Sequence, residues 1–224
     1  MYRVEDKFSC GKPEMYCLQK RLESVLQSDS NEGNTDGYSV SSLYFDDFRE
    51  SCLVDTVEGS RIRRKYRIRI YNHSLNTIKL EVKEKRDNRV RKKSRNITEE
   101  ELQKLMSGKC IKSLPSMDDP AALFNLAMQE EMLRPKLIVT YERKAFVFAP
   151  GNVRITLDRN IRSSDQVDFF GKKELSYDFL RGQDEVLEMK YDEFMPEFIL
   201  QLLELGNMQQ VPYSKYRLCR ERYE

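Results

Sequence analysis

Basic side chains recur at alternate positions within residues 61–95. Successive side chains of a β-strand point to opposite faces of the sheet. This alternation places Arg67 and Arg69 on one face of the run RIRRKYRIRIY and apolar residues on the other. It places Glu81 and Lys83 together on one face of the run IKLEVKEK, again opposite apolar residues. Each run therefore predicts a strand with a charged face and an apolar face.

A third basic run follows at residues 89–93. Alternation places Arg91 and Lys93 on one face and Lys92 on the opposite one. Two interpretations of the charged faces compete. The first is a half-buried antiparallel sheet with one side in water. The second is a surface whose cations together bind a polyanion. The remaining segments of the sequence are needed to choose between these two interpretations.

Four other segments alternate in the same way, near residues 2–9, 136–149, 153–162 and 186–192. The charged side chains of interest in them are Glu5, Lys7, Arg143, Arg154, Glu188 and Lys190. The predicted helices are amphipathic and need an apolar sheet face to pack against, so the charged faces must point away from the helices. A dry interior would cost several kcal/mol for each unpaired ion. The pattern therefore predicts a wide, water-filled tunnel lined by charged residues.

The lining residues define the chemistry. Arginine offers a rigid fork of donors that matches phosphate oxygens, and lysine supplies a compact charge. Glu5, Glu81 and Glu188 can hold Mg²⁺ or Mn²⁺, which binds one or two carboxylates together with phosphate oxygens. Such a lining suits a linear polyphosphate or a nucleoside triphosphate. Phosphoryl transfer needs mainly positioning and charge stabilisation, so no nucleophilic side chain is required.

Several other chemistries are disfavoured. The chain has no GxxxxGK[ST] motif, which excludes a P-loop enzyme. Its one histidine, His73, falls in a predicted turn, NHSLN, so neither a histidine-rich metal site nor a Ser-His-Asp triad is expected. Proteins that bind single-stranded RNA interleave aromatic with basic side chains on the ligand face. Tyr66 does not share the face of Arg67 and Arg69, which argues against base stacking.

Composition bounds the class of protein. The 224 residues include 39 Lys and Arg against 37 Asp and Glu, so the net charge of +2 says little about partners. Five cysteines show no CxxC spacing and predict neither a disulfide framework nor a zinc site. The N-terminal stretch lacks the apolar core of a signal peptide, and no apolar run approaches the roughly 20 residues that cross a bilayer. We expect a cytoplasmic protein.

The fold class predicted from these patterns is α+β, with residues 1–224 forming a single domain of about eight strands. Helices are predicted over about 13–27, 99–106, 119–132 and 196–205, and a short helical turn is one interpretation of residues 48–58. Thr98 and Glu101 have the spacing of a capping box at the start of the second helix. Pro150-Gly151-Asn152 predicts a hairpin turn.

Several motifs in order along the chain carry a family resemblance. They are RVEDKF, SLYFDD, KYRIRIY, LEVKEK, VRKKSR, TYERKAF, VRITLDRNIR, LEMKYD and YSKYR. Together they resemble the VTC-domain polyphosphate polymerases, which belong to the triphosphate tunnel metalloenzymes. The resemblance covers nearly the whole chain. It implies an antiparallel eight-stranded β-barrel tunnel with a charged interior and helices packed outside.

The resemblance also implies an activity and a set of residues. Family members transfer the γ-phosphate of ATP to a growing polyphosphate chain with the help of Mn²⁺ or Mg²⁺. The implied catalytic residues that contact phosphate are Arg67, Arg69, Lys83 and Arg143. The further phosphate-binding residues are Lys7, Lys92, Arg154 and Lys215, with Lys190 added because it shares the face of Glu188. The implied metal ligand is Glu188, with Glu81 and Glu5 as additional carboxylates from the alternation.

Three functions stay open at this point. The first is the metal-dependent polymerase. The second is a hydrolase of inorganic triphosphate or nucleoside triphosphates on the same fold, and the third is a non-catalytic module that binds polyphosphate. The expected partners are ATP or another nucleoside triphosphate and polyphosphate, without nucleic acid. The chain resembles a free-standing bacterial-type member, for which an unidentified membrane partner is conceivable and the oligomeric state is open.

Overall fold

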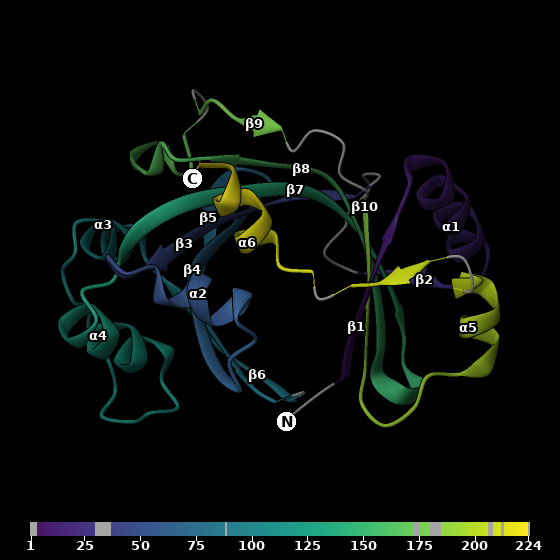
Figure 1. Cartoon of the computed structure of the whole chain (residues 1–224), viewed down its shortest axis with the longest axis horizontal. Coiled ribbons are helices and arrows are strands. Elements are labelled where there is room, and N and C mark those ends of the chain that lie inside the picture. The colour runs from purple at the N-terminus through teal and green to yellow at the C-terminus, as the bar shows by residue number, and fades with distance from the viewer. Residues whose placement is uncertain are drawn as a thin grey trace. The chain divides into compact units, whose positions relative to one another are not determined.

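The computed structural model describes residues 4–29, 37–87, 89–172, 175–179, 185–205, 208–211 and 213–223. The chain divides into two compact units, each built from three separate segments. Unit 1 comprises Met1–Ser39, Tyr141–Ile161 and Leu180–Tyr213, and unit 2 comprises Val40–Thr140, Arg162–Phe179 and Ser214–Glu224. Figure 1 labels the helices and strands of both units.

The described residues form eleven strands and six α-helices. The strands are β1 (Val4–Cys10), β2 (Gln27–Ser28), β3 (Tyr38–Asp46), β4 (Ile62–Tyr71), β5 (Ser74–Arg86), β6 (Arg89–Ile97), β7 (Arg134–Phe148), β8 (Val153–Ser164), β9 (Asp178–Phe179), β10 (Glu185–Tyr191) and β11 (Gln209–Gln210). The α-helices are α1 (Lys12–Val25), α2 (Ser51–Val57), α3 (Glu99–Met106), α4 (Pro120–Glu130), α5 (Glu197–Leu203) and α6 (Lys215–Arg220). Short 3₁₀ turns cover Pro150–Asn152, Val167–Phe169 and Glu221–Tyr223.

The strands belong to one sheet with the order β11-β1-β10-β8-β7-β3-β4-β5-β6, while β2 pairs with β7 and β9 with β8. Antiparallel pairing joins β1 to β10 and β11, β8 to β10 and β9, β2 to β7, β4 to β3 and β5, and β5 to β6. The predicted α+β class is therefore confirmed. The predicted barrel of eight strands is not: the sheet has eleven strands, and within the described ranges no pairing joins β11 to β6. The three additional strands are β2, β9 and β11, which have two residues each, too few to show alternation.

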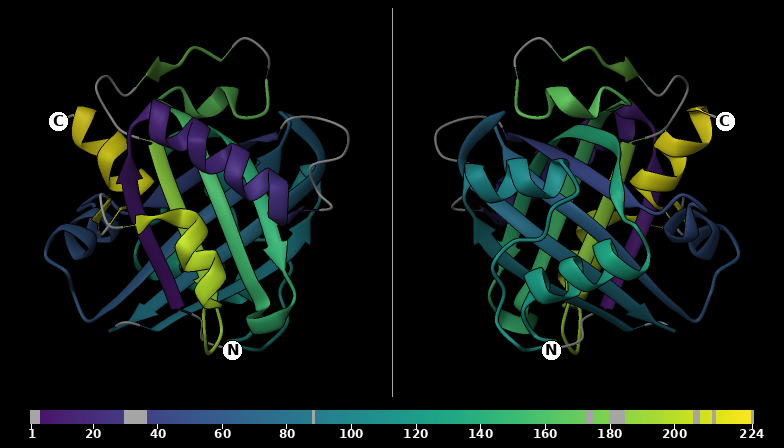
Figure 2. Two further views of the ribbon diagram at one scale, coloured as in Figure 1. Left: turned by 90° about the vertical axis from the view of Figure 1, so that its right-hand side faces the viewer. Right: turned by 90° about the vertical axis from the view of Figure 1, so that its left-hand side faces the viewer.

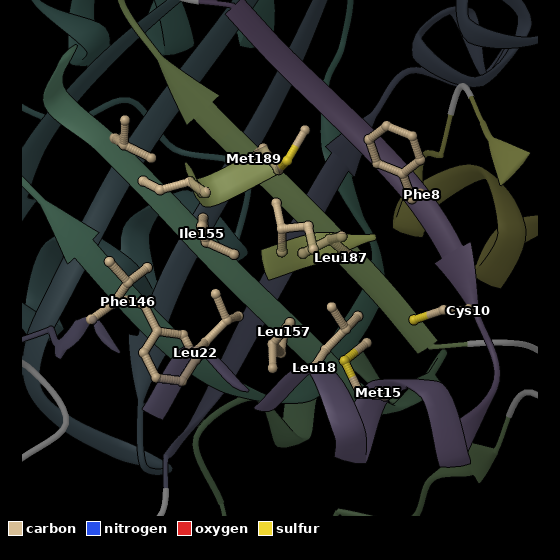
Figure 3. Close-up of a cluster of buried hydrophobic side chains, with 14 residues drawn as sticks. Phe8, Cys10, Met15, Leu18, Leu22, Phe146, Ile155, Leu157, Leu187 and Met189 are labelled. Atoms are coloured by element: carbon tan, nitrogen blue, oxygen red, sulfur yellow. The ribbon is translucent and has the colours of Figure 1, made fainter. Parts of the chain in front are cut away.

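The apolar face of unit 1 is covered by α1 and α5, as the first view of Figure 2 shows. Leu18 and Leu22 of α1 pack against Ile155 and Leu157 of β8 and Leu187 of β10 in one hydrophobic cluster (Figure 3). The cluster also takes in Phe8 and Cys10 of β1 and Ile199 and Leu203 of α5. Pro13 lies in the first turn of α1, where its missing N–H costs nothing. Lys7, Arg154 and Glu188, which alternate with these apolar residues, therefore point to the other face.

The apolar face of unit 2 is covered by α3 and α4, which lie across its strands in the second view of Figure 2. Phe124 of α4 makes edge-to-face contacts with Phe45 of β3 and Tyr66 of β4, at centroid distances of 5.2 and 5.3 Å. The predicted capping box is confirmed, because Thr98 Oγ1 accepts from Glu101 N and Glu101 Oε2 accepts from Thr98 N. In each unit the helices thus lie on the face opposite the predicted site residues, such as Glu188 in unit 1 and Arg67 in unit 2.

Two turns behave as the sequence indicates. Asn72 and His73 join β4 to β5 with φ values of 50° and 53°, the left-handed conformation that tight hairpins require. Burial and the nearby Arg162 lower the pKa of His73. Gly151 has a φ of 72° in the turn between β7 and β8. Helix α6 was not predicted, because the sequence around residues 211–223 shows only basic and aromatic character. Ser214 caps this helix, since its Oγ accepts a hydrogen bond from Arg217 N.

No described helix has both the length and the apolar character that a membrane-spanning helix needs.

Candidate functional site

Charged side chains from four strands gather around Glu188 in unit 1. The Glu188 carboxylate lies 3.2 Å from Lys190 Nζ, 3.6 Å from Lys7 Nζ and 3.6 Å from Arg143 Nη2. The register of β1 with β10 brings Lys7 opposite Glu188. Asp158 of β8 joins through Arg143. We call these five residues, Lys7, Arg143, Asp158, Glu188 and Lys190, the Glu188 cluster.

Arg143 is held rigidly within this cluster. Its Nε and Nη2 donate to the two carboxylate oxygens of Asp158 at 2.6 and 2.7 Å. Burial by itself would lower the pKa of Arg143, but the charges of Asp158 and Glu188 raise it well above its usual range. The guanidinium also lies over the ring of Tyr141, 5.1 Å from its centroid, as expected from their shared face. Arg143 is therefore a fixed and permanent positive charge.

The two lysines of the Glu188 cluster remain accessible. Lys7 and Lys190 have side chains that are 22% and 24% exposed. Lys7 Nζ donates to the carbonyl oxygen of Tyr213 at 2.9 Å. Burial lowers the pKa of Lys190, while the carboxylates of Glu188 and Glu5 oppose this shift. An anion that approaches these ammonium groups meets positioned charges at a solvent-accessible surface.

Arg154 stands next to the cluster, since the register of β8 with β10 places it opposite Lys190. Its Nη2 lies 2.5 Å from Asp29 Oδ2 and donates to the hydroxyl of Tyr38 at 3.1 Å. The predicted lining position is thus close to the right place, but its guanidinium is already paired with a carboxylate. A phosphate would have to share Arg154 with Asp29.

A second set of charges surrounds Glu81 in unit 2, and we call Arg67, Arg69, Glu81 and Lys92 the Glu81 cluster. Arg67 Nε donates to Glu81 Oε2 at 2.7 Å, and Lys92 Nζ donates to Glu81 Oε1 at 3.1 Å. Arg69 Nη1 lies 3.8 Å from Glu81 Oε2. Burial would raise the pKa of Glu81, but Arg67, Arg69 and Lys92 together hold it well below its usual range. The carboxylate is therefore ionised and surrounded by cations.

A row of lysines crosses three strands beside this cluster. Lys65 of β4 lies opposite Lys83 of β5, which in turn lies opposite Lys92 of β6. Like charges directly opposite each other destabilise a sheet. Lys65 Nζ donates to Ser214 Oγ at 2.7 Å. The row concentrates positive charge on one face, as expected for a surface that binds an anion.

The structure shows the two faces that alternation predicts for the third basic run. Lys92 lies on the face of Glu81, whereas Arg91 and Lys93 lie on the opposite face, 2.9 and 3.2 Å from Asp118 Oδ1. The predicted separation of Lys92 from Arg91 and Lys93 is therefore confirmed. The pairing of β5 with β6 sets the face, because Lys83 lies opposite Lys92.

Helix α6 brings Lys215 to unit 2 as its first residue, and the Lys215 side chain is half-buried. The next residue, Tyr216, donates through its hydroxyl to Asp46 Oδ2 at 2.7 Å and stacks on Tyr44 at 5.0 Å. Asp46 also accepts from the backbone N–H groups of Cys52 and Leu53 at the start of α2. The tail of the chain is thus anchored directly beside Lys215.

Neither cluster is a protein-only metal cage. In the part of the chain that the structure describes, no group of three or more His, Cys, Asp and Glu is arranged to hold a metal ion. Glu188 and Glu5 fit a divalent cation that completes its shell with phosphate oxygens, since both supply hard oxygen donors beside Lys190. Glu81 accepts hydrogen bonds from Arg67 at 2.7 Å and from Lys92 at 3.1 Å, so its geometry favours an ion pair.

Sequence reasoning missed two residues of the site. Alternation along residues 153–162 puts Asp158, the partner of Arg143, on the face of Arg154, but its pairing depends on a strand register that alternation does not give. Alternation puts Lys65 on the face of Arg67, but by itself gives Lys65 no role. The signal that could have identified Lys65 is its direct cross-strand position to Lys83 once the hairpin turn at His73 fixes the register.

The chain was compared with known proteins. The family model of the VTC domain matches residues 2–222. The chain therefore belongs to the VTC domain family, and the predicted family is confirmed. No curated protein sequence matches it.

Solved structures with the same fold span nearly the whole chain. A candidate adenylate cyclase from Bacillus halodurans is 15% identical, with a TM-score of 0.57 over 95% of this chain and 93% of that one. A candidate adenylyl cyclase from Hippeastrum, reported with a dominant triphosphatase activity, is 14% identical, with a TM-score of 0.56 over 98% and 96%. A Pyrococcus horikoshii protein is 16% identical, with a TM-score of 0.53 over 99% of both chains. At these identities the likeness shows the fold alone.

Proposed function

We propose that this protein is a metal-dependent phosphotransferase that moves the γ-phosphate of ATP onto a growing polyphosphate chain. The observation that supports this most is the pair of charged clusters, each with a buried carboxylate that orders several cations on a sheet face. Membership of the VTC domain family supports the same substrate class. Loose phosphoryl-transfer transition states need oriented positive charge more than a nucleophilic side chain.

The chain's own residues would act by positioning and neutralisation. In unit 1, Arg143 would contact a phosphate oxygen as a rigid donor, while Lys7 and Lys190 supply ammonium groups that adjust to the ligand. In unit 2, the proposed phosphate contacts come from Arg67, Arg69, Lys83, Lys92 and Lys215. Arg154 would contribute a contact shared with Asp29. The carboxylates hold these cations in place before the substrate arrives, which lowers the cost of ordering them on binding.

Glu188, with Glu5 as a second carboxylate, would hold Mn²⁺ or Mg²⁺ together with substrate phosphate oxygens. When bound, the ion would neutralise charge on the phosphate groups. Glu81, predicted as a further ligand, is assigned here to holding Arg67 and Lys92, because both donate hydrogen bonds to it, at 2.7 and 3.1 Å.

The second candidate function is hydrolysis of triphosphate or of nucleoside triphosphates. The triphosphatase activity reported for the Hippeastrum protein of the same fold supports this candidate. Both reactions break the same phosphoanhydride bond and need the same cations. They differ only in the acceptor, which is a polyphosphate terminus in the polymerase and water in the hydrolase.

The test is incubation of the purified protein with ATP and either Mn²⁺ or Mg²⁺. Gel electrophoresis and phosphorus NMR resolve the products. Polyphosphate with equivalent ADP is the expected result. Orthophosphate without polymer, from ATP or from inorganic triphosphate, would replace the polymerase by the hydrolase. Neither product, together with tight triphosphate binding, would leave a non-catalytic binding module.

Matched variants on the same strands locate the site. Lys92→Ala and Arg67→Ala should each lower kcat/KM roughly tenfold to a hundredfold, the usual loss with one charged contact. Lys93→Ala and Arg64→Ala should change it less than about twofold, because these residues pair with Asp118 and Glu84 on the opposite face. Equal losses of kcat/KM in both pairs of variants would show that the face carrying Arg67 and Lys92 is not the substrate-binding face.

A further inference from the structure

Thr156 of β8 is buried directly beside Glu188, with only 1% of its surface exposed. Its chain neighbours Ile155 and Leu157 belong to the hydrophobic cluster of unit 1 (Figure 3). The side chain of Thr156 therefore points to the opposite face of the strand, which is the face of the Glu188 cluster. In the pairing of β8 with β10, Glu188 is its direct cross-strand partner.

The hydroxyl of Thr156 has no hydrogen-bond partner among the residues that the structure describes. A buried polar group without a partner destabilises a folded protein, so native structures retain few of them. Thr140 of β7 is equally buried, yet its hydroxyl bonds with Ser41 Oγ at 2.9 Å and Tyr177 Oη at 3.2 Å. The contrast marks Thr156 as a donor that a bound ligand would satisfy.

We propose that Thr156 is a substrate-binding residue whose Oγ1 donates a hydrogen bond to an oxygen of a phosphate group held by the Glu188 cluster. Lys7, Lys190 and Arg143 attract this anion, but charge alone fixes its orientation weakly. A hydroxyl on a rigid, β-branched side chain adds a donor with one direction. This inference rests on the proposed function and deepens it by naming a neutral contact to the phosphate.

The experiment measures binding of inorganic tripolyphosphate by titration calorimetry, with EDTA present so that no divalent metal takes part. Thr156→Val keeps the shape of the side chain and removes the donor. It should weaken binding roughly tenfold or more, the loss expected for one hydrogen bond to a charged group. Thr156→Ser keeps the hydroxyl and should bind within about threefold of the unmodified protein.

Thermal unfolding separates a ligand contact from a structural role. Thr156→Val removes an unpartnered hydroxyl, so its Tm should equal or exceed that of the unmodified protein. Thr140→Val is the matched control: it leaves Ser41 and Tyr177 without this partner and should lower the Tm.

Unchanged tripolyphosphate affinity in Thr156→Val would overturn the inference and leave the proposed function standing. Weaker binding together with a lower Tm would also overturn it, because Thr156 would then be structural. No metal-free binding of tripolyphosphate to the unmodified protein would overturn the inference, whereas the proposed function is tested separately by the products formed from ATP with Mn²⁺ or Mg²⁺.

Discussion

Glu81 and Glu188 are both buried carboxylates surrounded by cations, but their contacts differ and indicate different roles. Glu81 accepts hydrogen bonds from Arg67 and Lys92 at 2.7 and 3.1 Å, whereas Glu188 lies 3.2 to 3.6 Å from its cations. The shorter bonds make Glu81 part of the protein's own ion-pair network. The longer contacts leave Glu188 better placed to take a divalent cation.

This difference predicts opposite results for two conservative variants. Glu188→Gln should raise the Mn²⁺ concentration needed for half-maximal activity by about tenfold or more, because a metal ligand loses its charge. Glu81→Gln should leave that concentration unchanged but lower the free energy of unfolding by roughly 3 kcal/mol, since three cations lose their buried counter-charge. Metal titrations of activity and urea unfolding measure the two effects. If Glu81→Gln instead raised the Mn²⁺ concentration needed for half-maximal activity, Glu81 would be a metal ligand.

Helix α1 is joined to β7 by an ion pair as well as by its apolar face. Lys144 Nζ lies 2.7 Å from Glu23 Oε1, and Lys144 is almost fully buried. Hydrogen bonds from Lys144, Lys20 and Gln19 lower the pKa of Glu23 from 4.5 to about 2. The folded protein therefore favours the ionised form of this carboxylate.

The stabilisation from Glu23 should be complete above about pH 5 and disappear as the pH falls from 4.5 towards 2, because the unfolded chain takes up the proton first. Glu23 is partly exposed, so solvent screening limits its contribution to about 1 kcal/mol. Glu23→Gln should cost about this much in urea unfolding at pH 7 and progressively less towards pH 3. In a Lys144→Met background most of the cost should vanish. A cost that does not depend on pH would show that the charge of Glu23 is not responsible.

Helices with clear end signals could be predicted closely from the sequence. The helix predicted over 99–106 is α3, because Thr98 and Glu101 form its capping box. Helix α6 was missed because its six residues are too few to show amphipathic periodicity. The faces of β4 and β5 were also predicted correctly, since apolar residues alternate with charged ones there. At β6 alternation separated Lys92 from Arg91 and Lys93 correctly, but alternation alone cannot choose the site face among three consecutive cations.

At the scale of the whole molecule, the residue types of the site could be predicted, but their partners could not. Arg143 and Asp158 lie fifteen positions apart on β7 and β8, and only the register of these strands creates their bidentate pair. Thr156 carries no signal in the sequence, since its lack of a partner is a property of the folded environment. Closure of the sheet into a tunnel was predicted from the charged faces and from the resemblance, but the pairing of its end strands is a matter of tertiary structure.

The division of the chain predicts how it unfolds. The boundary between the units passes through β7, between Thr140 and Tyr141, and through β8, between Ile161 and Arg162. Each unit is assembled from three segments, so neither corresponds to a contiguous stretch that could fold alone. Unfolding one unit would also break the hydrogen-bonded strands that continue into the other. We therefore expect a single cooperative transition, with equal calorimetric and van't Hoff enthalpies.

Two core variants test this coupling. Ile155 lies in the core of unit 1 and Leu80 in that of unit 2, and both are fully buried. Ile155→Ala and Leu80→Ala should each cost about 2 to 5 kcal/mol and shift the one calorimetric transition to lower temperature. Units that unfold independently would instead give two transitions, and each variant would move only one of them. A single shifted transition in both variants means that the strands carrying Arg143 and Asp158 unfold together with those carrying Arg67 and Glu81. A core substitution in either unit then lowers the unfolding temperature of both clusters.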